Sequence, residues 1–230
     1  MKISIIIPCY NEEKTLATIV NKVLNYQSFD KEIIIIDDCS SDQTPIIIEE
    51  LKKKYKEITS FKHEKNQGKG AGIRSGIKLA TGNIILIQDA DLEYNPKDYD
   101  KLLLPFLNSD ADIVYGSRFL GGDYVRLHFF WHHVANKLLT NFCNIFSNLN
   151  MSDMETGYKV FKSEVIKSIN LKESSFGIEP EITIKLAKKN FIFYEVPISY
   201  SGRSYDEGKK IGLKDAFVAI YCIVKYRFFD

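Results

Sequence analysis

The chain has 230 residues, of which 45% are hydrophobic and 27% are charged, and its formal net charge is +1. These values exclude an intrinsically disordered chain, a collagen-like repeat and a small disulfide scaffold. Because 31 Lys and Arg residues are balanced by 30 Asp and Glu residues, no overall positive field is available to hold nucleic acid. An anionic ligand therefore has to be met by a local site.

The chain shows no feature of a secreted or membrane-spanning protein. Its four cysteines lie far apart, without the C-x-x-C spacing of a zinc or redox site. The apolar segment at residues 3–7 is too short for a signal peptide. The longest uninterrupted apolar run covers the nine residues 216–224, whereas a spanning helix needs about 20. We therefore expect a cytoplasmic protein.

The first half of the chain alternates between strand and helix patterns. Apolar runs typical of strands buried on both faces cover residues 3–7, 33–36, 84–87 and 112–115, with a weaker one at 61–63. Helical patterns follow Asn11, a candidate N-cap, and Pro45, and cover residues 70–80 and 98–107. This alternation with short connections predicts a doubly wound α/β sheet.

The second half lacks the regular alternation of strand and helix patterns but continues the same domain. An amphipathic stretch at residues 127–146 is followed by strand patterns at 159–161 and 191–196 and by a helix at 179–189. A loop rich in Gly and charge, residues 201–212, precedes a last apolar helix. Since no repeat or low-complexity linker interrupts the chain, we predict a single domain over residues 1–230, in which residues 120–230 extend residues 1–119.

Acidic side chains gather where the predicted strands end. They are Glu12 after the first strand, Asp37 and Asp38 after the second, and Asp89, Asp91 and Glu93 after the strand at 84–87. In open α/β sheets, ligands bind outside the carboxyl ends of the strands. Mg²⁺ or Mn²⁺ typically takes one or two carboxylates together with phosphate oxygens. Alone, Asp89-Ala90-Asp91 is equally compatible with a solvated turn.

Four segments together resemble the nucleotide-sugar half of glycosyltransferase family 2. They are Pro8-Cys9-Tyr10-Asn11-Glu12, residues 36–42, residues 66–70 and Asp89-Ala90-Asp91. The resemblance spans residues 1 to about 120. It implies the GT-A fold, a Rossmann-like, mostly parallel central sheet flanked by helices, here with an acceptor-side extension in residues 120–230. It also implies that the D-x-D motif holds Mg²⁺ or Mn²⁺ on the diphosphate of a nucleotide sugar.

The resemblance implies a set of site residues in this chain. The nucleotide-sugar site would comprise Pro8, Tyr10, Glu12, Ile36, Asp38, Lys69, Asp89, Ala90 and Asp91. The metal ligands would be Asp89, Asp91 and Glu93, where Glu93 stands in place of the Gln that related mannose synthases commonly carry. The catalytic residues would be Asp89, Asp91, Arg118 and Asp153.

The second half is similar to one group within that family, the polyprenyl-phosphate sugar transferases such as the dolichyl-phosphate mannose synthases. The similar segments are residues 115–118, 153–159, Glu179 and the loop 202–212. The similarity implies an inverting transfer of a hexose from a donor of the GDP-mannose or UDP-glucose type to polyprenyl or dolichyl phosphate. Guanidinium groups bind phosphate oxygens bidentately, and the acceptor phosphate would be bound by Arg118, Arg126, Arg203 and Lys209.

Two other functions stay open. A family 2 enzyme acting on a sugar hydroxyl in cell-surface glycan synthesis needs a carboxylate base, for which Asp153 and Glu155 are the candidates, whereas a phosphate acceptor needs none. The other is a catalytically inactive sugar-nucleotide-binding protein. Loss of the Asp89 and Asp91 pair would favour it, but both residues are present. The segment Gly68-Lys69-Gly70 meets neither the dinucleotide nor the P-loop spacing, and the four histidines show no catalytic spacing.

The apolar helical stretches suggest contact with a membrane surface. A stripe at helical spacing consists of Leu127, Phe130, Trp131, Val134, Leu138, Phe142 and Ile145. Such a stripe more often packs into a core, but basic residues such as Lys225 and Arg227 beside an apolar face also suit helices in a lipid headgroup layer. Because the inferred acceptor is a membrane lipid, we expect peripheral binding at the cytoplasmic face of a membrane, where a separate membrane protein is a candidate partner.

Overall fold

The computed structural model describes residues 1–121, 126, 130–202 and 213–230. Seven strands form one sheet in the order β3-β2-β1-β4-β6-β5-β7. The strands are β1 (Lys2–Cys9), β2 (Asp30–Asp37), β3 (Ile58–Lys62), β4 (Ile84–Ile87), β5 (Ile113–Ser117), β6 (Lys159–Lys162) and β7 (Phe193–Pro197). All neighbouring pairs are parallel except the two that involve β6, which is antiparallel to β4 and to β5. The mostly parallel α/β sheet expected from the sequence is confirmed.

Isoleucine dominates the central strands because both faces of the sheet are covered. In β1, Ile5 pairs with Ile33 of β2 and with Leu86 of β4. Ile5 belongs to one buried core, while the next residue, Ile6, belongs to the core on the opposite face. Side chains of successive strand residues point to opposite faces, and β-branched residues pack well on a pleated surface. Continuous apolar runs are therefore the sequence pattern of these strands.

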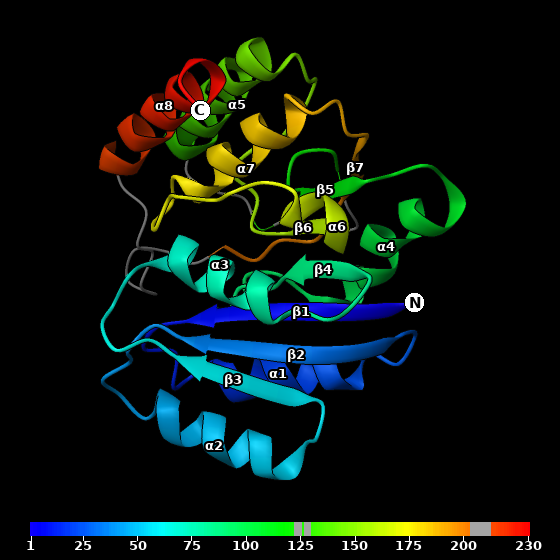
Figure 1. The fold of residues 1–230 in the computed structure, drawn as a ribbon, viewed down its shortest axis with the longest axis vertical. Coiled ribbons are helices and arrows are strands. Elements are labelled where there is room, and N and C mark those ends of the chain that lie inside the picture. The colour runs from blue at the N-terminus through cyan, green and yellow to red at the C-terminus, as the bar shows by residue number, and fades with distance from the viewer. Residues whose placement is uncertain (122–125, 127–129, 203–212) are drawn as a thin grey trace.

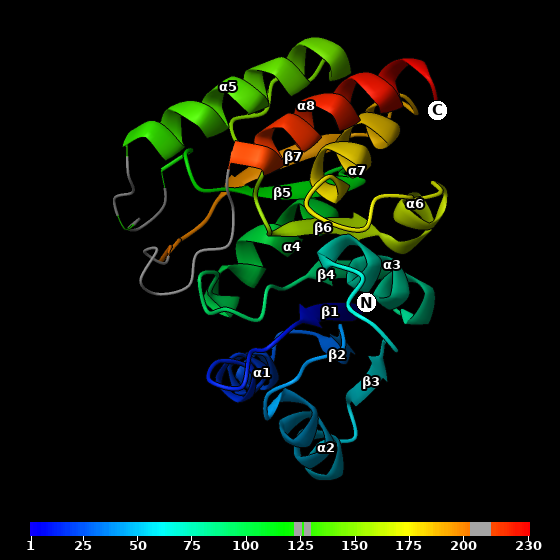
Figure 2. The same cartoon turned by 90° about the vertical axis from the view of Figure 1, so that its left-hand side faces the viewer.

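Helices cover both faces of the sheet (Figures 1 and 2). The helices α1 (Leu16–Asn25), α2 (Thr44–Lys54) and α4 (Tyr99–Asn108), the last preceded by the 3₁₀ helix η1 (Pro96–Asp98), pack on one face. The helices α3 (Lys69–Leu79), α5 (Phe130–Ser147), α6 (Ser163–Lys167), α7 (Ile178–Ala187) and α8 (Leu213–Phe228) pack on the other. Helices α5 and α8 lie side by side in both views. This two-sided arrangement is the doubly wound architecture expected from the sequence.

The start of the first helix differs from the prediction. Helix α1 begins at Leu16, whereas Asn11 has a backbone φ of 54° and lies in the preceding turn. The Asn11 side chain accepts a hydrogen bond of 2.9 Å from the backbone N–H of Ser41 instead of capping the helix. Asn tolerates the left-handed conformation because its short polar side chain can bond locally. The turn after β1 is thus tied to the turn after β2, at the edge where ligands bind in such sheets.

Two strands from the second half of the chain join the sheet formed by the first half. Strand β6 lies between β4 and β5, with Leu86 opposite Val160 and Val114 also opposite Val160. Strand β7 then adds beyond β5. Within the described residues, no helix has both the length and the apolar character needed to cross a membrane.

Candidate active site

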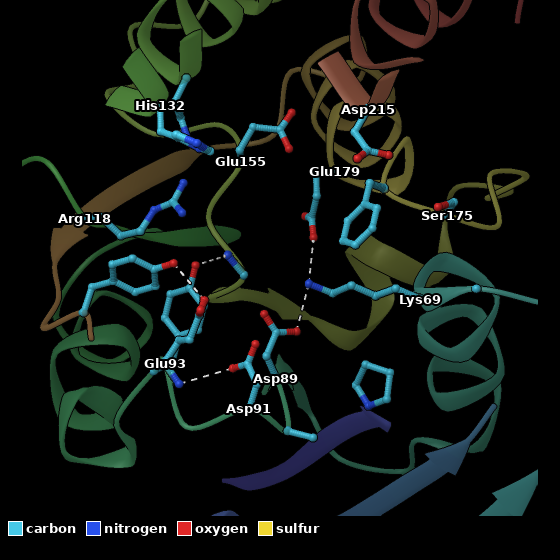
Figure 3. A pocket seen from close by; sticks show the side chains of 18 of the residues that line it. Lys69, Asp89, Asp91, Glu93, Arg118, His132, Glu155, Ser175, Glu179 and Asp215 are labelled. Atoms are coloured by element: carbon cyan, nitrogen blue, oxygen red, sulfur yellow. Dashed lines mark hydrogen bonds and ion pairs between the residues drawn. The ribbon is translucent and has the colours of Figure 1, made fainter. Parts of the chain in front are cut away.

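A cavity of about 620 Å³ opens at the carboxyl ends of β1, β2 and β4 and is walled on its far side by α5, α7 and the start of α8. Most of the residues predicted for the site line it. They are Pro8, Tyr10, Glu12, Asp38, Lys69, Asp89, Ala90, Asp91, Glu93, Arg118 and Glu155. Figure 3 shows how the charged side chains among them face one another across this space. The fold therefore brings residues from both halves of the chain to one place.

A row of alternating charges crosses the floor of the cavity (Figure 3). The Lys69 ammonium lies 2.8 Å from Asp89 Oδ1 and 3.4 Å from Glu179 Oε1. The other oxygen of Glu179 lies 2.6 Å from Nζ of Lys159, which is fully buried. Burial acts to lower the pKa of Lys69, but Asp89 and Glu179 raise it well above its ordinary value. Lys69, the first residue of α3, therefore remains positively charged beside Asp89 of the D-x-D motif.

Asp89 is held in place by the segment opposite it. A Cβ atom at Gly157 would come within 2.2 Å of Asp89 Oδ2 and 2.9 Å of the Tyr94 ring, so the absence of a side chain lets the two segments touch. The backbone N–H of Gly157 donates to the Tyr94 hydroxyl at 2.8 Å. Gly157 consequently packs directly against Asp89 and Tyr94, so the segment that carries it adjoins the D-x-D segment.

Asp89 and Asp91 fit a divalent cation whose remaining coordination positions are filled by a bound phosphate group. Both line the cavity and offer carboxylate oxygens, the donors that Mg²⁺ and Mn²⁺ prefer. The predicted third ligand, Glu93, accepts a hydrogen bond of 2.8 Å from the Tyr200 hydroxyl. No group of three or more Asp, Glu, His or Cys side chains in the described ranges is arranged to hold a metal. The expected three-carboxylate set is thus not assembled, and the remaining pair suits a metal that also takes phosphate oxygens.

Asp38 shapes the opposite wall. Its Oδ1 accepts from the backbone N–H of Gln67 at 2.9 Å and lies 2.6 Å from His63 Nδ1, and its Oδ2 accepts from the N–H of Gly68 at 2.6 Å. Gly68 has a φ of 95°, which favours glycine. The carboxylate of Asp38, predicted for the nucleotide-sugar site, therefore also fixes the loop that carries Lys69.

Arg118 marks the other end of the cavity. Its Nε and Nη2 donate to the two oxygens of Asp153, both at 2.7 Å, and its backbone N–H donates to Asp153 Oδ2 at 3.0 Å. Asp153 is fully buried, and its backbone N–H donates in turn to Glu195 of β7 at 3.0 Å. Burial acts to lower the pKa of Arg118, but Asp153 raises it well above its ordinary value. Asp153 thus orients Arg118 from behind and does not face the cavity.

Glu155 is a carboxyl group of this site whose pKa is raised by its surroundings. It lines the cavity, and its Oε1 is buried without a hydrogen-bond partner in the described part of the chain. Burial, followed by repulsion from Glu179, raises the pKa of Glu155 to about 7. A carboxyl group in this state exchanges its proton near neutral pH.

The remaining predicted residues lie elsewhere. Ile36 is fully buried in the core beneath α3, so its side chain does not face the cavity. Arg126 is exposed and donates to the carbonyl of Gly202 at 3.1 Å, outside the cavity lining. Arg203 and Lys209 fall outside the residues that the structure describes.

Several lining residues were not predicted. Glu179 received no role from the sequence, and neither did His132, His133 or Asp215, all of which line the cavity. A signal for the Glu179 pair exists in hindsight, because Lys159 interrupts an apolar strand and a buried Lys needs an acidic partner. No comparable signal marks the histidines, whose place depends on how α5 packs across the sheet ends.

A mostly parallel sheet with Asp89 and Asp91 beyond the end of its fourth strand and Lys69 beside them is the arrangement expected of a GT-A glycosyltransferase. The family model "Glycosyl transferase family 2" matches residues 4–169, and the chain belongs to that family. The enzyme class, the family and the fold expected from the sequence are confirmed.

Relatives and solved structures agree with this assignment. A dolichol-phosphate mannosyltransferase of Pyrococcus furiosus is 30% identical over 215 residues, which are 92% of this chain and 60% of the relative, so this chain spans about three fifths of that relative's length. An uncharacterized protein of Methanocaldococcus jannaschii is 29% identical, over 90% of this chain and 93% of its own. Glucosyl-3-phosphoglycerate synthase of Mycobacterium tuberculosis, in complex with Mn²⁺, UDP and phosphoglyceric acid, superposes with a TM-score of 0.75 at 17% identity, covering 100% of this chain and 79% of that one. That likeness establishes the fold.

Proposed function

We propose that the chain transfers a hexose, with inversion, from a nucleotide sugar of the GDP-mannose or UDP-glucose type to a polyprenyl phosphate, with Mg²⁺ or Mn²⁺. One observation carries the acceptor class: Trp131 of α5 lines the cavity and is also 76% exposed. The cavity thus reaches from the charged D-x-D end to an apolar outer face, as a lipid phosphate acceptor requires. The relative from Pyrococcus furiosus, whose name denotes transfer to dolichol phosphate, supports the same class.

The donor end is built to bind a diphosphate. Asp89 and Asp91 would hold the cation, and when bound it would neutralise charge that develops on the departing diphosphate. Lys69 is already fixed 2.8 Å from Asp89, so a second positive charge stands beside the leaving group without reorganisation. Complexes of the structurally similar synthase with Mn²⁺ or with Mg²⁺ and UDP support this use of a divalent metal.

The acceptor end is built to position an anion. Asp153 engages one edge of the Arg118 guanidinium through two hydrogen bonds, so the direction of that group is set before an acceptor arrives. A lipid phosphate is already ionised at neutral pH, and its transfer therefore needs alignment and charge stabilisation without a general base.

The outer face of α5 and α8 supports membrane association. Its exposed apolar side chains are Phe130, Trp131, Leu138 and Ile145 on α5 and Phe217 and Tyr221 on α8. The core contacts of α5 come from Leu139, Phe142, Cys143 and Phe146 instead. Most of the predicted stripe thus faces outward, while Leu127 lies outside the described residues. We propose that this face rests in the headgroup layer at the cytoplasmic side of a membrane.

A screen of donors and acceptors tests the proposal. Radiolabelled UDP-glucose, UDP-galactose and GDP-mannose are incubated with short polyprenyl phosphates and Mg²⁺ or Mn²⁺. We expect one donor to yield an organic-soluble product that disappears on chelation and in Asp91→Ala. Label that never enters the organic phase, with every donor and metal, rejects the acceptor class. Persistence of near-wild-type transfer in Asp91→Ala rejects the metal assignment.

One residue, Glu155, favours a second function, the transfer of a hexose to a sugar hydroxyl. If the acceptor is a sugar hydroxyl, a carboxylate with a pKa near neutrality is suited to act as general base, and Glu155 lines the cavity with a pKa of about 7. Asp153, the other candidate, is fully buried and bonded to Arg118. Transfer of label to a water-soluble glycan, abolished in Glu155→Gln, would favour this alternative.

A further inference from the structure

Glu155 lines the cavity and has a carboxylate oxygen that accepts no hydrogen bond from the described residues. Its Oε1 is buried and has no hydrogen-bond partner within the described part of the chain. Figure 3 shows Glu155 among the side chains that line the cavity, on the side of Glu179 away from Asp91. A buried carboxylate oxygen without a donor costs free energy, and a ligand that brings a donor would relieve that cost.

The charges around Glu155 decide what kind of ligand it can accept. Glu179 and Asp153 act to keep it protonated, whereas Lys159 and Arg118 act in the opposite direction. Lys159 and Arg118 are already paired, with Glu179 and Asp153 respectively. In its ionised form Glu155 would repel an anion such as a phosphate. A neutral polyol, whose hydroxyl groups donate hydrogen bonds, is the ligand that fits.

The position of Glu155 relates it to the donor. Two residues further along, Gly157 touches Asp89 and is bonded to Tyr94. Glu155 lines the same cavity as Asp89 and Arg118, on the segment that Gly157 brings against Asp89. A donor whose diphosphate is held at Asp89 and Asp91 places its hexose in this cavity, because the sugar is joined to the diphosphate.

We infer that Glu155 accepts a hydrogen bond from a hydroxyl group of the donor hexose and so helps to select the sugar. This inference rests on the proposed function, in which the acceptor is a phosphate and Glu155 has no proton to remove. Since a site built to bond a hydroxyl discriminates against sugars that lack it or carry it in another orientation, Glu155 is a specificity residue.

Calorimetric titration without acceptor tests the inference, because it separates the sugar from the nucleotide. UDP, GDP, UDP-glucose and GDP-mannose are titrated in Mg²⁺ into the wild type, Glu155→Gln and Glu155→Asp. For the preferred donor, we expect the ratio of nucleotide-sugar to nucleoside-diphosphate affinity to fall roughly tenfold or more in Glu155→Gln. Glu155→Asp, which keeps a shortened carboxylate, should retain part of the ratio. Affinity for the nucleoside diphosphate alone should not change.

Glu164→Gln on α6 is the matched control, since it removes the same charge from an exposed position. Its affinity ratio should equal that of the wild type. An unchanged ratio in Glu155→Gln overturns the inference, and so does an equal loss of affinity for nucleotide and nucleotide sugar, which indicates structural damage. Wild-type protein that binds no nucleotide or nucleotide sugar would instead reject the proposed function, and this inference with it.

Discussion

Two lysines compensate the charges of Asp89 and Glu179 at the cavity. Lys69 compensates Asp89 and one oxygen of Glu179, and Lys159 compensates the other oxygen of Glu179. Removing one member of a buried pair leaves an uncompensated charge, which is strongly destabilising. Because this row of charges joins residues up to 110 positions apart, from Lys69 to Glu179, no local pattern could predict it. The D-x-D motif was predictable from its resemblance to the family motif together with its place after a buried strand, since Asp89-Ala90-Asp91 alone is equally compatible with a solvated turn.

Gly157→Ala should disable the donor site. The new Cβ would stand 2.2 Å from Asp89 Oδ2, so Asp89 must move, and a displacement of about 1 Å in a functional group can cost about 100-fold in rate. We expect Mn²⁺-dependent affinity for UDP and GDP, measured by calorimetry, to fall at least tenfold.

Gly82→Ala is the control for that substitution. It introduces a similar clash, with Cβ 2.8 Å from the carbonyl oxygen of Lys2, at the opposite end of β4. It should lower the melting temperature without weakening nucleotide binding. Nucleotide affinity lowered equally in both variants would show that the effect of Gly157→Ala is general loss of stability.

Glu155→Gln should stabilise the protein in a pH-dependent way. The pKa of Glu155 rises from an ordinary value of 4.5 to about 7 because of burial and Glu179. The folded state therefore binds a proton more tightly than the unfolded state, and wild-type stability falls as pH rises from about 4.5 to 7. Gln does not titrate, so the variant should gain about 3 kcal/mol at pH 8 and much less at pH 5. Calorimetric melting at both pH values measures this, and an equal gain at both would contradict it.

Regular elements were predictable from the sequence where burial repeats along the chain. Strand β4 was predicted with its observed bounds because its four apolar residues are buried on both faces. The five-residue helix α6 was missed because it is too short to show a helical period. The direction of the α5 stripe could not be predicted either, since a stripe of this kind can face a core or a membrane. That choice depends on which residues α7 and α8 cover.

The outward face of α5 and α8 should bind anionic vesicles. Deleting the chain after Asp215 would also remove Cys222, Ile223 and Tyr226 from the core, so surface substitutions are the sharper test. The double variant Phe217→Ser, Tyr221→Ser removes two exposed rings and should weaken vesicle sedimentation at least tenfold, since burying one such side chain contributes about 1.5–3 kcal/mol. Leu104→Ser, Leu107→Ser removes exposed apolar side chains from α4 on the other face and should change nothing. Equal binding by all three proteins would reject the interfacial role.

At the scale of the molecule, the order of strands makes the two halves interdependent. Residues 1–119 were expected to hold the nucleotide sugar and residues 120–230 to extend them. Strand β6 comes from the second half yet separates β4 from β5, and Glu179 and Gly157 of the second half contact Lys69 and Asp89 of the first. The sequence showed where each half would begin a strand, but pairing between strands is decided by contacts that are distant along the chain.

A fragment of residues 1–119 should therefore fail to fold into a binding-competent unit. Without β6, strands β4 and β5 lose the neighbour that each bonds on one side, and the apolar face of the sheet covered by α5, α7 and α8 is exposed to water. We expect the fragment to show no cooperative urea transition by circular dichroism and no calorimetric heat with UDP or GDP. The full chain should unfold in one transition. A fragment that binds nucleotide with wild-type affinity would show that the donor site is complete without Glu179 and Gly157, and that the row of charges from Asp89 to Lys159 is dispensable for it.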